Sequence, residues 1–256
     1  MFPRLDCSSV TTTLTSLAQI LEMPAPELAS VLASVDLDAF YRNHPRYEIP
    51  GEEVILSHVL ESGGKEPVVE EAVWFHITRC FAETDFAEGL LPLGDVLELL
   101  WRNLYSLVAE EVPAEEWRQC RDGLQTDGNH SARLYRMKVA GRHLWGPYGM
   151  LIRDLAFDPQ PVRNHDFLRG PEIIEDICRC FLALHGIDLL SRFRSATRPC
   201  IVKFVGEAPT IDCVGSALLY LHLKYRGLPL SQRCNCNFDA AGTPVSRSQI
   251  LEVQLL

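Results

Sequence analysis

Three short segments rich in β-branched and aromatic residues stand far apart in this chain, at residues 71–79, 198–207 and 249–256. This composition favours strands. Most of the chain between them has the caps and apolar spacing of helices. Strands so widely separated can form a sheet only by pairing across long helical stretches. The sequence therefore predicts an α+β fold, a mostly helical chain with a small sheet of widely separated strands.

The helical segments divide the chain at about residue 67. Helical spacing with Ser and Thr caps runs through residues 1–67, where we expect a helical N-terminal lobe. Residues 68–256 are expected to form an α+β domain with a helical insertion, and one continuous core for both parts stays open. Longer helices are predicted at residues 94–112, 113–124, 170–186, 187–197 and 210–227.

Two further helical predictions concern segments with weaker signals. A brief helix is predicted within residues 83–93, with Thr84 as a cap and Gly89 as its end. Residues 130–159 are predicted to form two helices that are broken at the sequence WGPYG.

Composition and charge exclude some classes of protein. The formal net charge of -10 argues against a protein held on duplex DNA, because neutralising phosphates requires a basic face. No apolar stretch approaches the length of a membrane span, and the first residues do not resemble a signal segment. The nine cysteines are an odd number without the spacing of a disulfide scaffold. We therefore expect reduced thiols, a cytoplasmic location and no membrane contact.

The sequence VWFHITRC places a histidine inside a short apolar segment. On a strand, His76 and Thr78 point to the same side, and Phe75 and Ile77 point to the other. A ring nitrogen and a hydroxyl can then reach one ligand, and Arg79 can reach a phosphate or carboxylate. The alternative is that His76 is a core histidine with a hydrogen-bond partner and that Arg79 pairs with a neighbouring Glu.

The stretch FHITRCFAETDFAEGLLPL, residues 75–93, resembles the first motif of the ADP-ribosyltransferase superfamily. It is most similar to the branch that contains the RNA 2'-phosphotransferases and the toxins that modify DNA bases. In that family a strand ends in His-x-Thr or His-x-Ser, and a short helix and a Gly-Leu segment follow. The resemblance implies that His76 and Thr78 would hold the nicotinamide ribose and amide of NAD, which is a substrate, with Arg79 near the diphosphate.

The resemblance also implies an acceptor and a carboxylate. The acceptor would be a protein or a nucleic acid. The acidic surface argues against tight binding of duplex DNA and leaves single strands open as acceptors, and a toxin-like chain would have an inhibitory protein partner. The family places a catalytic glutamate or a second arginine on a late strand, and Glu252 in SQILEVQLL has the residue type and order of the glutamate. There it would stabilise the ribosyl cation. The alternative is that Glu252 faces solvent on an edge strand.

The sequence HLWGPYGMLIRDL marks a second candidate segment. Tyr148 stands between glycines and a proline, where it could stack on a base or on nicotinamide, and Arg153 follows in a position to touch the diphosphate. The alternative is a plain corner with Arg153 on the surface. This sequence also lacks a clear middle motif of the family and has a longer helical region between the first and last motifs.

Other polar and sulfur-bearing segments are weaker candidates. A loop with mixed charge can bind a partner or simply be solvated; it contains Arg163, His165, Asp166 and Arg169. The pairs Cys178 with Cys180 and Cys234 with Cys236 have one residue between them, closer than usual zinc spacing, and no metal is expected.

Two readings of the function remain. One is NAD-dependent ADP-ribosyl or related phosphoribosyl transfer, which requires His76, Thr78 and Glu252 to converge on one cleft. The other is a non-catalytic interaction or regulatory protein of α+β fold, in which these side chains lie apart.

Overall fold

The computed structural model describes residues 3–46, 48–126 and 128–256. It contains helices and one small sheet, so the predicted α+β fold is confirmed. None of the helices within the described residues combines the length and apolar character needed to cross a bilayer.

The sheet has five strands, which are β1 (Glu71–Cys80), β2 (Tyr148–Met150), β3 (Arg198–Glu207), β4 (Asn237–Asp239) and β5 (Ile250–Leu255). They lie in the order β4-β2-β1-β3-β5. β1 and β2 are antiparallel, with Phe75 opposite Met150. The predicted strands β1, β3 and β5 are confirmed. β2 and β4 were not predicted, because three residues are too few to show alternation.

The chain divides into two compact units, each assembled from three stretches of sequence. Unit 1 contains residues 1–75, 149–164 and 203–238. Unit 2 contains residues 76–148, 165–202 and 239–256.

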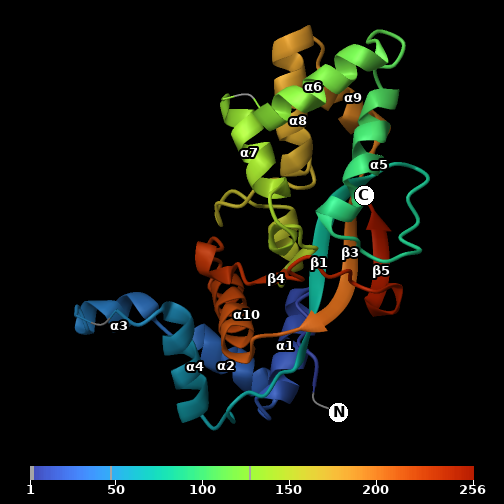
Figure 1. The fold of residues 1–256 in the computed structure, drawn as a ribbon. Helices are drawn as coiled ribbons and strands as arrows, with labels where there is room; N and C mark the ends of the chain where they lie inside the picture. The colour runs from blue at the N-terminus through green and yellow to red at the C-terminus, as the bar shows by residue number, and fades with distance from the viewer. Residues whose placement is uncertain (1–2, 47, 127) are drawn as a thin grey trace. The chain divides into compact units, whose positions relative to one another are not determined.

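Unit 1 is built around one long helix, α10 (Thr210–Tyr225). The start of the chain forms four helices, which are α1 (Val10–Ile20), α2 (Ala25–Ser34), α3 (Leu37–Asn43) and α4 (Gly51–Glu61). Helix α10 packs against α1, α2 and α4 (Figure 1). Val214, Leu218 and Leu221 of α10 are fully buried. The helices predicted before residue 68 are therefore present, and they share a core with a helix from late in the sequence.

Unit 2 contains the remaining helices, which are α5 (Leu93–Ser106), α6 (Ala114–Thr126), α7 (His130–Val139), α8 (Glu172–His185) and α9 (Leu189–Ala196). Their core is a cluster of buried aliphatic and aromatic side chains. Trp101 and Trp117 pack edge to face with ring centroids 5.2 Å apart, and Trp101 Nε1 donates to the Tyr135 hydroxyl at 3.1 Å. The predicted helix end at Gly186 is confirmed, since Gly186 caps α8 with φ 69°.

The brief helix predicted within residues 83–93 is wrong. The segment forms turns up to the start of α5, with Phe86 and Gly89 both at positive φ. Leu90 instead pairs its backbone with Val245 in both directions, with both N–H to O distances at 2.9 Å. Tertiary pairing therefore overrides the helical pattern of this short segment.

The second of the two helices predicted within residues 130–159 is also wrong. After α7 the chain forms a 3₁₀ turn (Arg142–Leu144), strand β2 and a second 3₁₀ turn (Arg153–Ala156). The residues of β2 and those next to it satisfy their backbone groups in the sheet. A helix there would leave the edge of β1 unpaired.

Candidate functional site

His76 lies on β1, and its ring is fixed by the neighbouring strand. Its Nδ1 is 2.8 Å from the carbonyl oxygen of Tyr148 on β2. Since a carbonyl can only accept, Nδ1 carries the proton and donates. In the neutral ring Nε2 is then an acceptor with a lone pair.

The surroundings of His76 favour this neutral form. The side chain is half-buried. Burial lowers the pKa of His76 below its ordinary value, and the hydrogen bond to Tyr148 works in the opposite direction. A neutral imidazole with an oriented Nε2 can accept a hydrogen bond or a proton from a ligand.

Tyr148, whose backbone carbonyl holds His76, has an exposed side chain. About 47% of the residue is accessible, and its hydroxyl donates to the Leu144 carbonyl at 2.8 Å. An exposed ring on a fixed backbone is a suitable surface for stacking a flat group. The structure therefore brings the His76 ring to the backbone of Tyr148. The register of the two strands sets Tyr148 opposite Ile77, so the Tyr148 ring lies on the other face of the sheet from His76.

Three loop segments of unit 2 are joined by backbone hydrogen bonds next to Tyr148. Gly242 N–H donates to the Gly146 carbonyl at 2.7 Å, and Ala240 N–H donates to the Pro147 carbonyl at 3.0 Å. The Leu90–Val245 pairing ties the segment after β1 to the same stretch of chain. The segment after β1 and the chain on either side of Tyr148 are thus joined through residues 240–245.

Thr78 and Arg79 differ in how far hydrogen bonds inside the fold occupy their side chains. Thr78 is half-buried and lies two residues along β1 from His76. The Arg79 guanidinium donates four hydrogen bonds, which go to Leu168 O at 2.7 Å, Arg194 O at 2.8 Å, Thr197 O at 2.8 Å and Thr197 Oγ1 at 3.0 Å. Arg79 therefore holds α9 and the loop before α8 to β1.

Glu252 lies apart from His76. It is exposed on β5, and β3 separates β5 from β1 in the sheet. Two strand spacings amount to about 10 Å. The structure therefore does not bring the Glu252 carboxylate to the His76 ring.

A different carboxylate, which the sequence did not single out, acts on Tyr148. Asp239 lies on β4, the neighbour of β2. Burial raises the pKa of the Tyr148 hydroxyl, and the charge of Asp239 raises it further. Asp239 was missed because β4 was not predicted, so nothing in the sequence placed it beside Tyr148.

Arg153 belongs to unit 1, whereas His76 and Tyr148 belong to unit 2. Its guanidinium lies over the Phe157 ring, with 5.0 Å from Cζ to the ring centroid. This contact gives Arg153 a packing role within its own turn.

The weaker candidates have local structural roles. His165 Nε2 is 2.7 Å from the Gly170 carbonyl, and Asp166 Oδ1 accepts from the Arg169 N–H at 3.1 Å, so these residues fold their own loop. Both cysteine pairs are buried. Within the described residues, no three His, Cys, Asp or Glu side chains form a group that could hold a metal ion.

Comparison with protein-family models, with curated proteins and with solved structures finds no match to this chain.

Proposed function

We propose that unit 2 binds NAD beside His76 and transfers its ADP-ribosyl group, or a related phosphoribosyl group, to a protein or single-stranded nucleic-acid acceptor. The observation that carries the proposal is the hydrogen bond from His76 Nδ1 to the Tyr148 carbonyl at 2.8 Å. It fixes the neutral imidazole with Nε2 as an acceptor. The resemblance of residues 75–93 to the first motif of ADP-ribosyltransferases gives this acceptor its ligand.

Transfer of the ADP-ribosyl group requires few catalytic groups from the protein. The bond between the ribose C1' and the nicotinamide nitrogen breaks, and nicotinamide leaves as a neutral molecule with the electron pair. The acceptor then forms a bond to C1' and loses a proton. In this scheme Nε2 of His76 accepts a hydrogen bond from a ribose hydroxyl.

The arrangement of the other side chains refines the roles that the sequence assigned. Arg79 uses its donors within the fold, so the proposal leaves it out of the diphosphate site. A carboxylate is still needed near the ribosyl cation. Asp239 beside Tyr148 and Glu252 on the edge strand are the two candidates, and variants separate them.

The test is release of nicotinamide from NAD by the purified chain, followed by chromatography. We expect His76→Gln to lower the rate about tenfold or more, because an oriented group is lost from the reacting ribose. The matched control is His130→Gln, which changes an exposed histidine at the start of α7. Asp239→Asn and Glu252→Gln then show which carboxylate contributes.

Absence of nicotinamide release, together with absence of NAD binding, would contradict the proposal. The same result would favour the second candidate, a non-catalytic interaction protein. The observations on its side are the four hydrogen bonds that Arg79 donates inside the fold and the exposed position of Glu252.

A further inference from the structure

Two cysteines of unit 1 that are distant in sequence meet in its core. Cys213 lies in the first turn of α10, and Cys236 immediately precedes β4. Their Sγ atoms are 3.3 Å apart. A disulfide bond joins sulfur atoms at about 2.05 Å, so these two atoms need to approach by only about 1.2 Å to form one.

The backbones that carry the two thiols are held beside each other by hydrogen bonds. The hydroxyl of Ser216, three residues along α10 from Cys213, donates to the Arg233 carbonyl at 3.1 Å. The Cys236 carbonyl accepts from the Leu151 N–H at 3.0 Å. Because both ends of the pair are anchored, rotation of the two side chains is the movement that closes the remaining gap.

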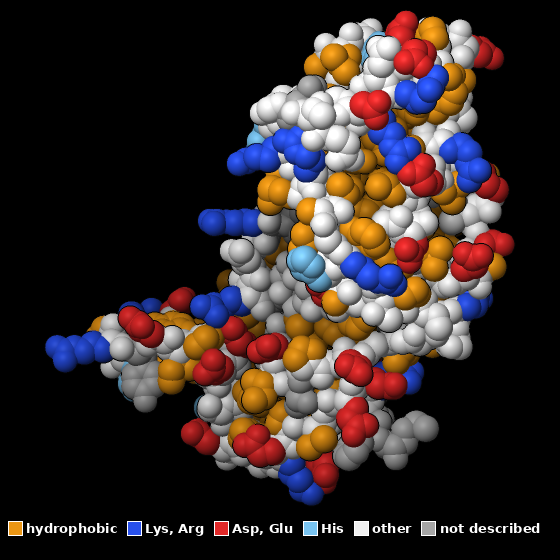
Figure 2. Space-filling model, in the orientation of Figure 1, with side chains coloured by type: hydrophobic (Ala, Val, Ile, Leu, Met, Phe, Trp, Pro, Cys, Tyr) orange, Lys and Arg blue, Asp and Glu red, His pale blue; other side chains and the backbone are white. Residues whose placement is uncertain are grey.

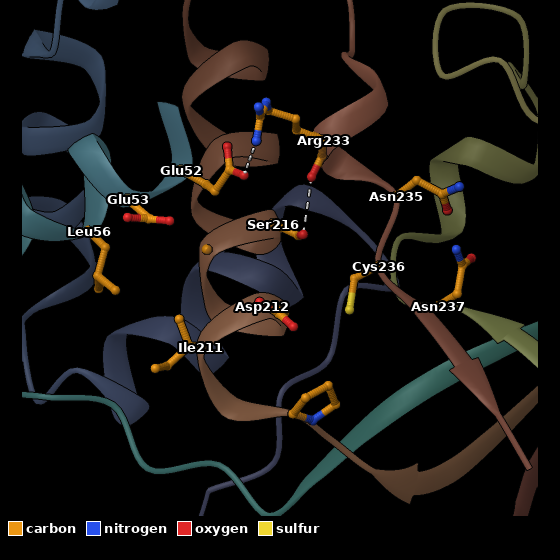
Figure 3. Close-up of a pocket in the computed structure, with 12 residues that line it drawn as sticks. Glu52, Glu53, Leu56, Ile211, Asp212, Ser216, Arg233, Asn235, Cys236 and Asn237 are labelled. Carbon is orange, nitrogen blue, oxygen red and sulfur yellow. Dashed lines mark hydrogen bonds and ion pairs between the residues drawn. The ribbon is translucent and has the colours of Figure 1, made fainter. Parts of the chain in front are cut away.

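The two thiols differ in their access to solvent. Cys213 is fully buried, whereas Cys236 is 9% exposed and is one of the residues that line a pocket of about 510 Å³ (Figure 3). The first turn of α4, the first turns of α10 and residues 233–237 form the walls of this pocket. A small molecule that enters it therefore meets Cys236 before Cys213.

The contact between the thiols gives them different roles. Cys213 has no access to water, so it is the thiol that keeps its proton and donates it to the Cys236 sulfur. This hydrogen bond, together with burial, raises the pKa of Cys213, and the same hydrogen bond lowers the pKa of Cys236. Cys236 is thus the one that forms a thiolate, and a thiolate is the form of cysteine that attacks an oxidant.

The charge of the pocket limits which oxidants reach Cys236. Glu52, Glu53 and Asp212 are carboxylates, and Arg233 is the one cation among the lining residues that the structure describes. Figure 2 shows Asp and Glu side chains gathered over the helices of unit 1. A lining with excess negative charge repels anions and leaves the way open to a small neutral molecule.

We propose that Cys213 and Cys236 form a reversible disulfide when a small neutral peroxide such as hydrogen peroxide enters the pocket. The Cys236 thiolate attacks one peroxide oxygen, the O–O bond breaks, and the hydroxide that leaves takes up a proton to become water. Cys236 is then a sulfenic acid. The Cys213 sulfur attacks the Cys236 sulfur, and the sulfenic oxygen leaves as a second water with the Cys213 proton.

The two thiols together lose two electrons and two protons in this sequence, and one hydrogen peroxide is reduced to two waters. All the residues involved belong to unit 1, so the proposal is independent of NAD binding.

The experiment exposes the reduced full chain to hydrogen peroxide, blocks the remaining thiols and maps linked peptides by mass spectrometry. Trypsin places Cys213 in residues 204–224 and Cys236 in residues 234–247. We expect these two peptides to become linked, and dithiothreitol to separate them. The wild-type chain suffices for this result, so it does not depend on the folding of any variant.

A second pair of thiols in the same chain is the internal control. Cys80 and Cys200 hydrogen-bond to each other on β1 and β3, both are buried, and neither is among the described lining residues of the pocket. We expect the pair in the pocket wall, Cys213 and Cys236, to oxidise about tenfold faster or more, because a peroxide reaches only one of the two pairs directly.

Glutathione disulfide tests the kind of oxidant. It is larger than hydrogen peroxide and negatively charged, so at equal concentration we expect it to oxidise the pair about tenfold more slowly or less.

Variants identify the atoms. Cys213→Ser should stop the reaction at the sulfenic acid of Cys236, which dimedone labels, and Cys236→Ser should give neither a link nor a label at Cys213. Trypsin leaves Cys234 and Cys236 in one peptide, so Cys234→Ser is the matched control, and its link to Cys213 should form as in wild type.

Thermal melting measures the effect of the link on the fold. We expect the melting temperature of the oxidised chain to rise by about 5 °C or more, because the bond closes the loop between Cys213 and Cys236. Three results would overturn the proposal. They are absence of the linked peptides in peroxide-treated wild type, oxidation of Cys80 and Cys200 at the same rate or faster, and equal rates with glutathione disulfide and peroxide.

Discussion

His76 shows how a neighbouring strand decides the chemistry of one side chain. The carbonyl of Tyr148 accepts from Nδ1, and burial lowers the pKa of the ring. Sequence alone predicted that His76 points to one side of a strand with Thr78. It did not predict the partner of Nδ1, because Tyr148 is far away in sequence and lies on a strand of only three residues.

The lowered pKa of His76 predicts how stability changes with pH. The unfolded chain binds the proton at about pH 6.5, and the folded chain binds it only at lower pH. The folded state is therefore penalised as the pH falls below about 6.5. Between pH 7.5 and 5.5, we expect wild type to lose up to about 1 kcal/mol more unfolding free energy than His76→Gln.

Urea unfolding at the two pH values measures this difference. Equal losses in wild type and His76→Gln would mean that His76 protonates as easily in the folded chain as in the unfolded chain.

Arg79 provides a second test at the scale of the residue. Its guanidinium donates to three backbone carbonyls and to the Thr197 hydroxyl, a fork that an ammonium group cannot reproduce. We expect Arg79→Lys to lower the free energy of unfolding by about 1–3 kcal/mol. The exposed Arg102→Lys should change it by less than about 0.5 kcal/mol.

Denaturant unfolding of both variants gives the comparison. If Arg79→Lys were as stable as wild type but did not bind NAD, Arg79 would be a ligand-binding residue and not a structural one.

At the scale of elements, long helices with clear ends and long apolar strands were predicted well. β3 and α8 are examples, because each is specified by its own residues over ten or more positions. The segments at residues 83–93 and 148–156 were not, since their structure depends on pairing with Val245 and with β1. The candidate site lies where these segments pair, and for that reason the sequence predicted it only in part.

The segment after β1 depends on Gly89. It has φ +91°, and a Cβ there would stand 2.1 Å from the Val245 carbonyl oxygen. Gly89→Ala should therefore lower the unfolding free energy by about 2 kcal/mol or more, through strain and lost pairing. Gly186→Ala is the matched control, because Gly186 has φ +69° with nothing within 4 Å, and it should cost about 1 kcal/mol.

Thermal or urea unfolding separates the two costs. If Gly89→Ala destabilised the chain no more than Gly186→Ala, close packing against Val245 would not be part of the folded structure.

Helices α7 and α8 are joined by a buried ion pair. Lys138 Nζ is 2.7 Å from Asp176 Oδ2, and the Asp176 side chain is 2% exposed. Lys138→Met leaves that carboxylate without its closest cation, so we expect a loss of about 3 kcal/mol in unfolding free energy. Adding Asp176→Leu should recover most of it. A similar small loss for Lys138→Met and for Arg118→Met, which removes an exposed pair, would contradict this account.

At the scale of the whole molecule, the chain is an acidic α+β protein whose two units each combine distant parts of the sequence. The predicted strands and most predicted helices are present. The proposed NAD site depends on long-range packing more than on any local motif, since the partner of His76 Nδ1 comes from a strand that is far away in sequence.

The central claim is that the oriented His76 ring meets NAD, and ¹⁵N spectra of the histidine side chains test it most directly. With His76 assigned through the His76→Gln variant, we expect NAD to shift the His76 Nε2 resonance while Nδ1 stays protonated by its bond to Tyr148. The resonances of exposed histidines such as His130 should not move. An unchanged His76 spectrum at millimolar NAD would contradict the account and leave this histidine as a structural residue of β1.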